Sequence, residues 1–220
     1  MSSSRNNTSL PKASLFIILL SSCIFLFLVW LVLNGKTNSL DESAFAFSKK
    51  ITTDTNTRWI LAITFLGKHS FLIPANISLL IFLAIQKNRS LFLRLLLISL
   101  SSVAVMSLVK RLVHRIRPEN GMIEGVTNFS FPSGHAFMSV ALYGFLIWWS
   151  ASEIKGQRLR IFLIIFLVLL ILIVGCTRIY LRMHYASDVL AGFAGGTAWL
   201  LSCLYIKQKL ENRPVNKMPG

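Results

Sequence analysis

Six long stretches of this chain carry almost no charge, and this feature limits the folds available to it more than any other. A helix needs roughly 20 apolar residues to cross a bilayer, and the backbone polar groups inside a bilayer must be satisfied within the chain. We therefore predict an all-α integral membrane protein, a six-helix bundle that forms a single domain over residues 1–220. The expected spans cover about residues 13–35, 68–86, 91–109, 136–152, 161–177 and 189–206.

The composition supports a membrane protein. Hydrophobic residues make up 54% of the chain and charged residues only 14%, whereas a soluble domain carries roughly 25% charged residues. The first apolar stretch is longer than the core of a secretory signal, about 7–15 residues, and lacks a convincing cleavage site, so we interpret it as a retained anchor. The three cysteines form no C-x-x-C pair that would indicate a metal or redox site.

The net charge of +15 raises the question of a nucleic-acid partner. Lys and Arg gather at the ends of the expected spans, where they anchor helices and meet anionic headgroups. No basic patch alternates with aromatic residues, as binding of single-stranded nucleic acid requires, so we expect no nucleic-acid partner. The third span extends back from 95 to 91 if Arg94 snorkels towards the surface, and we interpret Trp148 and Trp149 as interfacial anchors.

Six spans place both termini on one side of the membrane. With the termini in the cytoplasm, 12 of the 23 Lys and Arg residues lie inside and the rest outside, so the positive-inside rule hardly selects an orientation. The basic cluster at 110–117 inflates the outer total, and anion binding is one explanation for it. Residues 36–58 fit either an interfacial amphipathic segment or a polar loop. Residues 59–67 fit a helix that leads into the second span, with a turn at 67–68.

Three polar motifs stand at span ends. In the first, KRLVHRIRP, Lys110 and Arg117 are seven apart, which returns to one helix face after two turns. We expect the helix to end just before Pro118, because a residue before proline avoids helical geometry. In the second, NFSFPSGHAF, Ser133 is a favourable N-cap and Gly134 lets a ligand approach the backbone. The helix that follows would direct free N–H groups at an anion.

The third motif is TRIYLRMHYASD, in which Arg178 closes the fifth span. His184 and Asp188 stand at i and i+4, which stacks imidazole and carboxylate on one helix face. The topology brings all three motifs to one membrane surface, where His135 lies on the first turn of the fourth span. Two histidines, an aspartate and three cations suit phosphoryl transfer. Zinc is the competing use of such ligands, but the cations would repel it, so we expect no metal and no cofactor.

In combination, K-x6-RP, PSGH and R-x5-H-x3-D resemble the three signature motifs of the type 2 phosphatidic acid phosphatase family. They fall at residues 110–118, 132–135 and 178–188. One departure is Thr177, where the family usually has serine, and the hydroxyl is retained.

The resemblance implies a metal-independent lipid phosphatase with a histidine nucleophile. His184 would attack phosphorus to form a phosphohistidine, Asp188 would orient it, and His135 would protonate the leaving lipid oxygen. The phosphoryl oxygens would be held by five residues: Lys110, Arg117, Ser133, Gly134 and Arg178. We interpret three further arginines as headgroup or surface contacts: Arg111, Arg115 and Arg182. Of these, Arg182 is close enough in sequence to help bind substrate. His69 and His114 are interpreted as interfacial residues. Gly192 and Gly196 are interpreted as helix-packing positions.

The resemblance also implies a multi-pass protein of a bacterial cytoplasmic membrane, with its site on the extracytoplasmic face and both termini in the cytoplasm. Candidate substrates are undecaprenyl pyrophosphate, phosphatidylglycerophosphate, phosphatidic acid and diacylglycerol pyrophosphate. A lipid A phosphatase of the same family and a non-enzymatic lipid-binding or transport protein are alternatives. Vanadium haloperoxidases share the anion pocket but are soluble. The motifs carry no information on the oligomeric state.

Overall fold

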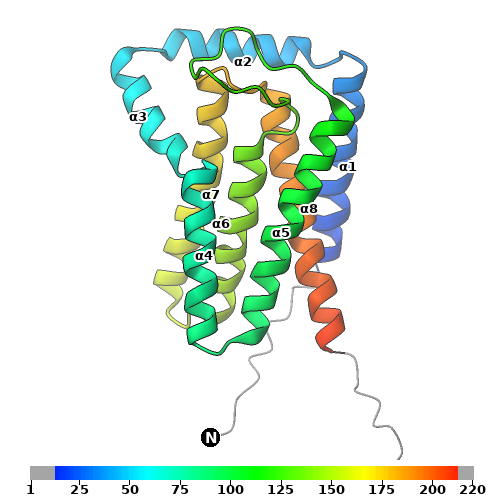
Figure 1. Ribbon diagram of the computed structural model, residues 1–220, viewed down its shortest axis with the longest axis vertical. Helices are drawn as coiled ribbons and strands as arrows, with labels where there is room; N and C mark the ends of the chain where they lie inside the picture. The colour runs from blue at the N-terminus through cyan, green and yellow to red at the C-terminus, as the bar shows by residue number, and fades with distance from the viewer. Residues whose placement is uncertain (1–12, 213–220) are drawn as a thin grey trace, which may run out of the picture.

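The computed structural model describes residues 13–212, and within them it contains eight α-helices and no β-strand (Figure 1). The prediction of an all-α fold is therefore confirmed. The helices are α1 (Ser14–Leu33), α2 (Asn38–Ile51), α3 (Asp54–Phe65), α4 (His69–Ile85), α5 (Arg89–Val113), α6 (Gly134–Glu153), α7 (Gln157–Tyr180) and α8 (Ala186–Glu211). The sequence also predicts a short basic tail after about residue 210, which falls mostly outside the described residues.

Five segments of the described chain are long and apolar enough to cross a membrane, against the six expected. They are α1, the α3–α4 pair taken together, α5, α7 and α8. The expected span that falls outside this group is 136–152, which lies in α6, a helix of 20 residues. Most of its central residues are buried against neighbouring helices. A helix inside the bundle meets protein instead of lipid, so it can carry Ser, Gly and Tyr where a lipid-facing helix carries Leu and Ile.

Most of residues 36–58 are helical, in α2 and the start of α3, so the segment is not a polar loop. Helix α2 lies across one end of the bundle (Figure 1). It buries Asp41 and Ser48 on its inner side and exposes Leu40, Phe47 and Ile51. The hydroxyl of Ser48 donates a hydrogen bond to the backbone carbonyl of Tyr180 in α7. This distribution matches an amphipathic helix that packs by its polar side.

Helix α3 starts earlier than the apolar run at 59–67 indicated. Its N-cap is Thr53, whose hydroxyl accepts a hydrogen bond from the backbone N–H of Asn56 at 3.2 Å, a normal way of satisfying a free helix-end donor. The helix ends at Phe65, and a turn through Gly67 leads into α4, so the predicted helix and turn are confirmed.

The bundle is packed around α6, which contacts α7 on one side and α8 on the other. Close approach depends on glycines in α8. A Cβ atom built on Gly192 would lie 2.7 Å from the Cβ of Ala136 and 2.8 Å from the backbone oxygen of Ser133. A Cβ on Gly196 would lie 3.0 Å from the backbone oxygen of Phe137. The interpretation of these two glycines as packing positions is confirmed, and Gly192 holds α8 against the start of α6.

At the end of the bundle opposite α2, the charged side chain of Arg94 is buried and does not extend to the surface. Arg94 is 3% exposed and pairs with Glu211 of α8, and its guanidinium lies 5.1 Å from the centre of the Trp148 ring. Trp148 is also buried. Neither side chain extends outward as a snorkelling arginine or an interfacial anchor would, because an ion pair and a cation–π contact satisfy the arginine inside the bundle.

We expect Gly192→Ala to destabilise the protein. The added methyl meets a backbone oxygen, which cannot rotate away as a side chain can, and overpacking of this kind costs about 1–3 kcal/mol. The matched control is Gly156→Ala, because a Cβ at Gly156 meets nothing within 4 Å and its φ of −69° suits alanine. Thermal unfolding in detergent should show a lower midpoint for Gly192→Ala alone. Equal midpoints for the two variants would contradict the packing argument.

Candidate active site

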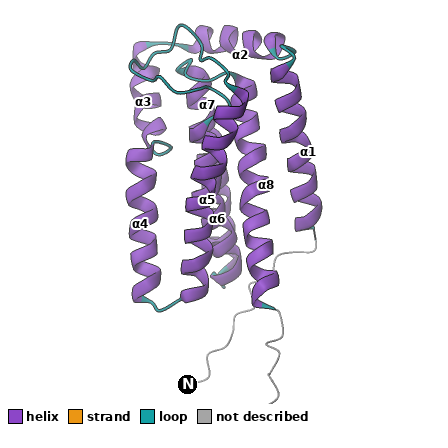
Figure 2. Cartoon of the chain, turned by 45° about the vertical axis from the view of Figure 1, so that its right-hand side comes forward, coloured by secondary structure: helices purple, strands orange, loops and turns teal. Residues whose placement is uncertain are grey.

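The three sequence motifs meet at the end of the bundle that α2 crosses. The long loop after α5, the start of α6 and the short connection between α7 and α8 converge there (Figure 2). All eight predicted site residues lie in these segments or within a helical turn of them. Five of the eight are buried: Lys110, Ser133, Arg178, His184 and Asp188.

His184 and Asp188 come together, but not by the geometry that the sequence predicted. His184 precedes α8, which begins at Ala186, so the two side chains do not share a helix face. Asp188 instead occupies the N3 position of a capping box, where its Oδ2 accepts from the backbone N–H of Tyr185 at 3.0 Å. The distance from His184 Nδ1 to Asp188 Oδ2 is 3.6 Å, longer than a normal hydrogen bond.

Ser130 fills the space between them. Its hydroxyl donates to Asp188 Oδ2 and lies 3.3 Å from His184 Nδ1. Ser130 is fully buried. Ser130 was not among the predicted site residues, although it stands only three positions before Ser133 in the second motif. Imidazole, hydroxyl and carboxylate form one buried polar chain.

The first motif departs from the predicted helix. Helix α5 ends at Val113, four residues earlier than expected, and His114 adopts a left-handed backbone with φ of +50°. Lys110 and Arg117 therefore share a site without sharing a helix face. Arg117 turns back so that its NH1 lies 3.2 Å from Nε2 of His184. Lys110 donates to the backbone carbonyls of Phe129 and Ser130.

The second motif forms the start of α6. Ser133 occupies the N-cap position as expected, but its side chain makes no cap hydrogen bond, and its Oγ is buried without a partner among the described residues. The first N–H groups of any helix have no partner within the helix. His135 lies on the first turn and packs against the α3–α4 turn, because a Cβ on Gly67 would come within 2.9 Å of its Cδ2.

Arg178 lies in the last turn of α7. Its side chain is held by a contact with α3, a helix that carries none of the three motifs. Its NH1 donates to the hydroxyl of Thr64 in α3 at 2.9 Å. Thr177 donates to the same hydroxyl at 2.9 Å. Arg178 also keeps a buried Nε with no partner among residues 13–212. Thr64 lies in an apolar run and gave no sequence signal.

The interpretation of Arg115 as a surface contact is wrong. Its side chain is 15% exposed and forms ion pairs with Asp188 at 2.7 Å and with Asp41 of α2 at 2.7 Å. Arg111, by contrast, is exposed, and Arg182 is half-buried. No sequence pattern singles out Asp41, which stands beside Glu42 in a polar segment.

Burial and positive charge determine the protonation of the site. Burial lowers the pKa of His184 to about 3, and the charges of Arg117 and Lys110 act in the same direction, while Asp188 opposes them. Burial also lowers the pKa of Arg117, which stays charged at neutral pH because it starts so high. His184 is therefore neutral at pH 7, and Nε2 has a free lone pair when Nδ1 carries the proton.

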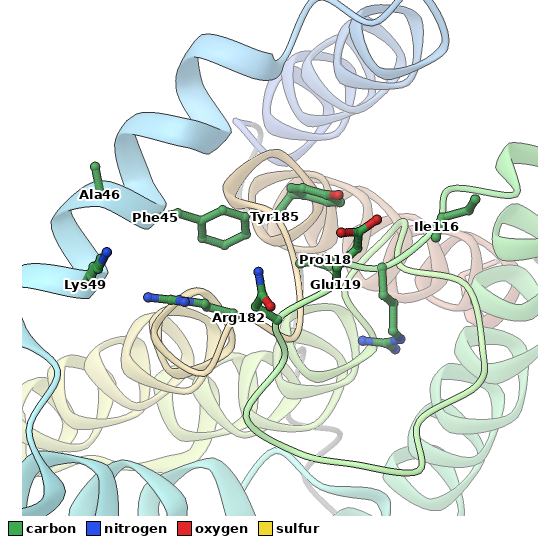
Figure 3. Close-up of a pocket in the computed structure, with 10 residues that line it drawn as sticks. Phe45, Ala46, Lys49, Ile116, Pro118, Glu119, Arg182 and Tyr185 are labelled. Carbon is green, nitrogen blue, oxygen red and sulfur yellow. The ribbon is translucent and has the colours of Figure 1, made fainter.

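An open cavity of about 640 Å³ adjoins the site. Figure 3 shows Phe45 of α2 and the ring of Tyr185 beside each other in its wall, with Lys49 and Arg182 on the same side. Arg117 lines the cavity and also contacts His184, so it connects the two. Within residues 13–212, no group of three or more His, Cys, Asp or Glu residues is placed to hold a metal ion.

Comparison with known proteins identifies relatives of the same architecture. The chain is 27% identical to phosphatidylglycerophosphatase B of Bacillus subtilis strain 168 over 179 residues, 79% of this chain and 87% of that protein. It is 28% identical to lipid phosphate phosphatase delta of Arabidopsis thaliana over 102 residues, 46% of this chain and 24% of that protein.

Two solved structures have a similar fold. The crystal structure of a transmembrane PAP2-type phosphatidylglycerolphosphate phosphatase from Bacillus subtilis superposes with a TM-score of 0.76 at 24% identity, covering 87% of this chain and 98% of that one. The crystal structure of Aquifex aeolicus LpxE gives a TM-score of 0.60 at 22% identity, covering 75% and 94%.

The family itself is shown by a family model. The model of the PAP2 superfamily matches residues 91–212, more than half of the chain and the whole region that holds the three motifs. The resemblance seen in the sequence is confirmed at the level of the family. The chain belongs to the PAP2 superfamily and is a membrane phosphatase that acts on lipid phosphates.

Proposed function

We propose that this phosphatase hydrolyses its lipid substrate without a metal, through a phosphohistidine on His184. The observation that carries the proposal is the position of this imidazole. Its Nδ1 faces the Ser130 hydroxyl and the Asp188 carboxylate, while its Nε2 faces the guanidinium of Arg117. One nitrogen is held by a base and the other opens towards cations, as a nucleophile that attacks phosphate requires.

In the first step, the Nε2 lone pair attacks phosphorus. The N–P bond forms, the bond from phosphorus to the lipid oxygen breaks, and His135 donates a proton to that oxygen. The ring of His184 then carries positive charge, which Asp188 stabilises through Ser130. In the second step, His135 takes a proton from water, the water oxygen attacks phosphorus, and the N–P bond breaks to release inorganic phosphate.

The remaining motif residues form the phosphate cradle. Arg117 and Arg178 are able to hold phosphoryl oxygens bidentately, and Lys110 supplies a point charge. Ser133 offers a hydroxyl that has no other partner within the described residues. Gly134 offers a backbone N–H at the positive end of α6. The Ser133 hydroxyl and the Nε of Arg178 have no partner among the described residues, so these two donors can bind phosphate without giving up an existing hydrogen bond.

The membrane arrangement is part of the proposal. We take α6 as the sixth span, since its 20 residues reach across the hydrocarbon core and its neighbours shield it from lipid. The chain then forms one six-span domain in the cytoplasmic membrane. The start of α1 and the end of α8 lie at the bundle end opposite α2 (Figure 1). With both termini in the cytoplasm, α2 and the site lie at the extracytoplasmic face.

Phosphatidylglycerophosphate is the first substrate to test, because the Bacillus subtilis relative that aligns with 79% of this chain is named for that reaction. Undecaprenyl pyrophosphate, phosphatidic acid, diacylglycerol pyrophosphate and a lipid A phosphate complete the panel. A transport role fits less well, because transporters place ionisable groups near the bilayer midplane, whereas these groups gather at one end of the bundle.

Substitution of either histidine should reveal its role. We expect His184→Ala to abolish phosphate release, and His135→Asn to slow it by about 10²–10⁴-fold, the usual contribution of a general acid. The matched control is His114→Asn, an exposed histidine at a left-handed position that asparagine tolerates. Release of inorganic phosphate from the lipid panel in detergent is the measurement. Full turnover in His184→Ala would refute the mechanism.

Removal of metal ions should leave the reaction unchanged. The donors around the substrate phosphate are Lys, Arg, hydroxyl and backbone N–H groups, and these neutralise the phosphoryl charge themselves. We expect the same rate of phosphate release before and after dialysis against EDTA. A loss of activity that added Mg²⁺ or Zn²⁺ restores would show that the reaction uses a metal.

The buried neutral state of His184 predicts a pH dependence of stability. Its pKa is about 3 in the folded protein and roughly 6.5 when unfolded. Between these values the unfolded chain binds the additional proton, so the free energy of unfolding falls as the pH falls from 6.5 towards 3. Between pH 7 and pH 5 this residue alone should cost about 2 kcal/mol.

The measurement for this prediction is the unfolding midpoint in detergent at several pH values. His184→Asn, which cannot be protonated, should lose less stability between pH 7 and pH 5 than the unsubstituted protein. Parallel curves for the two proteins would show that His184 is not the group responsible.

A further inference from the structure

Arg115 stands outside the residues assigned above, yet it holds the carboxylate of Asp188 from the side away from His184. Its NH1 donates to Asp188 Oδ1 at 2.7 Å and to the Ser187 hydroxyl at 2.7 Å. Its NH2 donates to Asp41 Oδ2 at 2.7 Å and to the Thr37 hydroxyl at 3.0 Å. The planar guanidinium thus connects the first turn of α8 to α2.

The two carboxylates that share this cation are both buried. The Asp41 side chain is 4% exposed and the Asp188 side chain 0%. Two anions taken out of water repel each other, and each needs a positive partner to remain charged. Asp41 also accepts from the backbone N–H and the hydroxyl of Ser187, each at 2.9 Å. Arg115 is the cation that forms ion pairs with both acids.

The two oxygens of Asp188 have different partners. Oδ2 accepts from Ser130 and from the backbone N–H of Tyr185, and it is the oxygen closest to His184. Oδ1 accepts from Arg115. With Oδ1 held by a charged donor, the carboxylate cannot rotate, and Oδ2 stays directed at Ser130 and the imidazole.

Aromatic packing fixes the guanidinium in turn. The Arg115 guanidinium carbon lies 4.0 Å from the centre of the Tyr185 ring, a cation–π contact. The centre of the Phe45 ring from α2 lies 5.6 Å from that of Tyr185, and Figure 3 shows these two rings side by side in the cavity wall. The arginine is therefore placed by α2, the α7–α8 connection and the start of α8 together.

We propose that Arg115 is a positioning residue for catalysis, which keeps Asp188 ionised and aligned so that Asp188 can support the phosphorylated His184. It acts through Asp188 and does not contact the substrate. The inference rests on the proposed function, because it needs His184 as the nucleophile. The competing explanation is structural: Arg115 only docks α2 on the bundle through Asp41.

Two variants separate these explanations. Arg115→Met removes the cation from both carboxylates. Asp41→Asn keeps the shape at α2 and leaves the Arg115–Asp188 pair intact, while it removes the charge through which α2 is docked. A docking role predicts similar losses of activity in both variants, whereas a positioning role predicts a loss in Arg115→Met that Asp41→Asn does not share.

The experiment uses the full-length protein in detergent with the lipid that it hydrolyses best. For Arg115→Met we expect kcat to fall about 10- to 100-fold, the equivalent of one charge-assisted hydrogen bond, with KM changed less than about threefold. The inhibition constant of vanadate, a mimic of the phosphoryl transition state, should rise by the same factor as kcat falls. Arg115→Lys should recover part of kcat, since it restores the charge without the fork.

Asp41→Asn should keep kcat within about threefold, even if its unfolding midpoint falls. Arg111→Met is the matched control, since Arg111 is an exposed arginine four residues before Arg115, and it should behave as the unsubstituted protein. If Arg115→Met does not fold, kcat and the inhibition constant of vanadate are compared for Arg115→Lys instead.

The inference is overturned if Arg115→Met and Asp41→Asn lose kcat equally, or if kcat is unchanged in Arg115→Met and Arg115→Lys. It is also overturned if kcat falls without any change in vanadate inhibition. An unsubstituted protein that releases no phosphate from any lipid would overturn the proposed function, and the inference with it. Phosphate release by the unsubstituted protein therefore shows whether the proposed function has failed or only the role assigned to Arg115.

Discussion

The hydrocarbon core of a membrane offers the backbone no hydrogen-bonding partner, and the placement of this site follows from that constraint. Irregular chain is confined to regions outside the lipid or shielded by protein. All eight motif residues accordingly lie in a connection or within about one turn of a helix end. A helix end also supplies free N–H groups for binding an anion. The bilayer thus favours helix ends for polar side chains, and the N-terminal end of a helix is also where an anion can be bound.

Close packing then determines how accurately these ends meet. Helix α6 carries His135 and runs through the middle of the bundle, where glycines of α8 let the backbones approach. Since α6 is surrounded by protein, its apolar character is lower than that of the lipid-facing helices. Its burial among other helices makes α6 suitable as the central support. The lower apolar content that goes with this burial explains why α6 is not among the segments that qualify as membrane spans by length and composition.

The sequence predicted the membrane fold and the eight motif residues because both depend on local patterns: uncharged runs and fixed spacings at their ends. It misjudged the end of α5, since Pro118 sets only an outer limit and His114 turns the chain earlier. Arg115 and Asp41 are 74 positions apart, and Thr64 and Arg178 are 114 apart. Such pairs depend on how helices pack, which no local pattern encodes, so the supporting residues could not be predicted.

The open cavity beside Arg117 has a thermodynamic consequence for a lipid phosphatase. The two products belong to different phases: inorganic phosphate dissolves in water, whereas the dephosphorylated lipid stays dissolved in the bilayer. In the orientation proposed above, the site lies at the boundary between the phases and releases each product into its own solvent. Reversal then requires phosphate to return from a large aqueous volume and meet the lipid again at one point, so dilution drives the reaction forward without any coupled energy source.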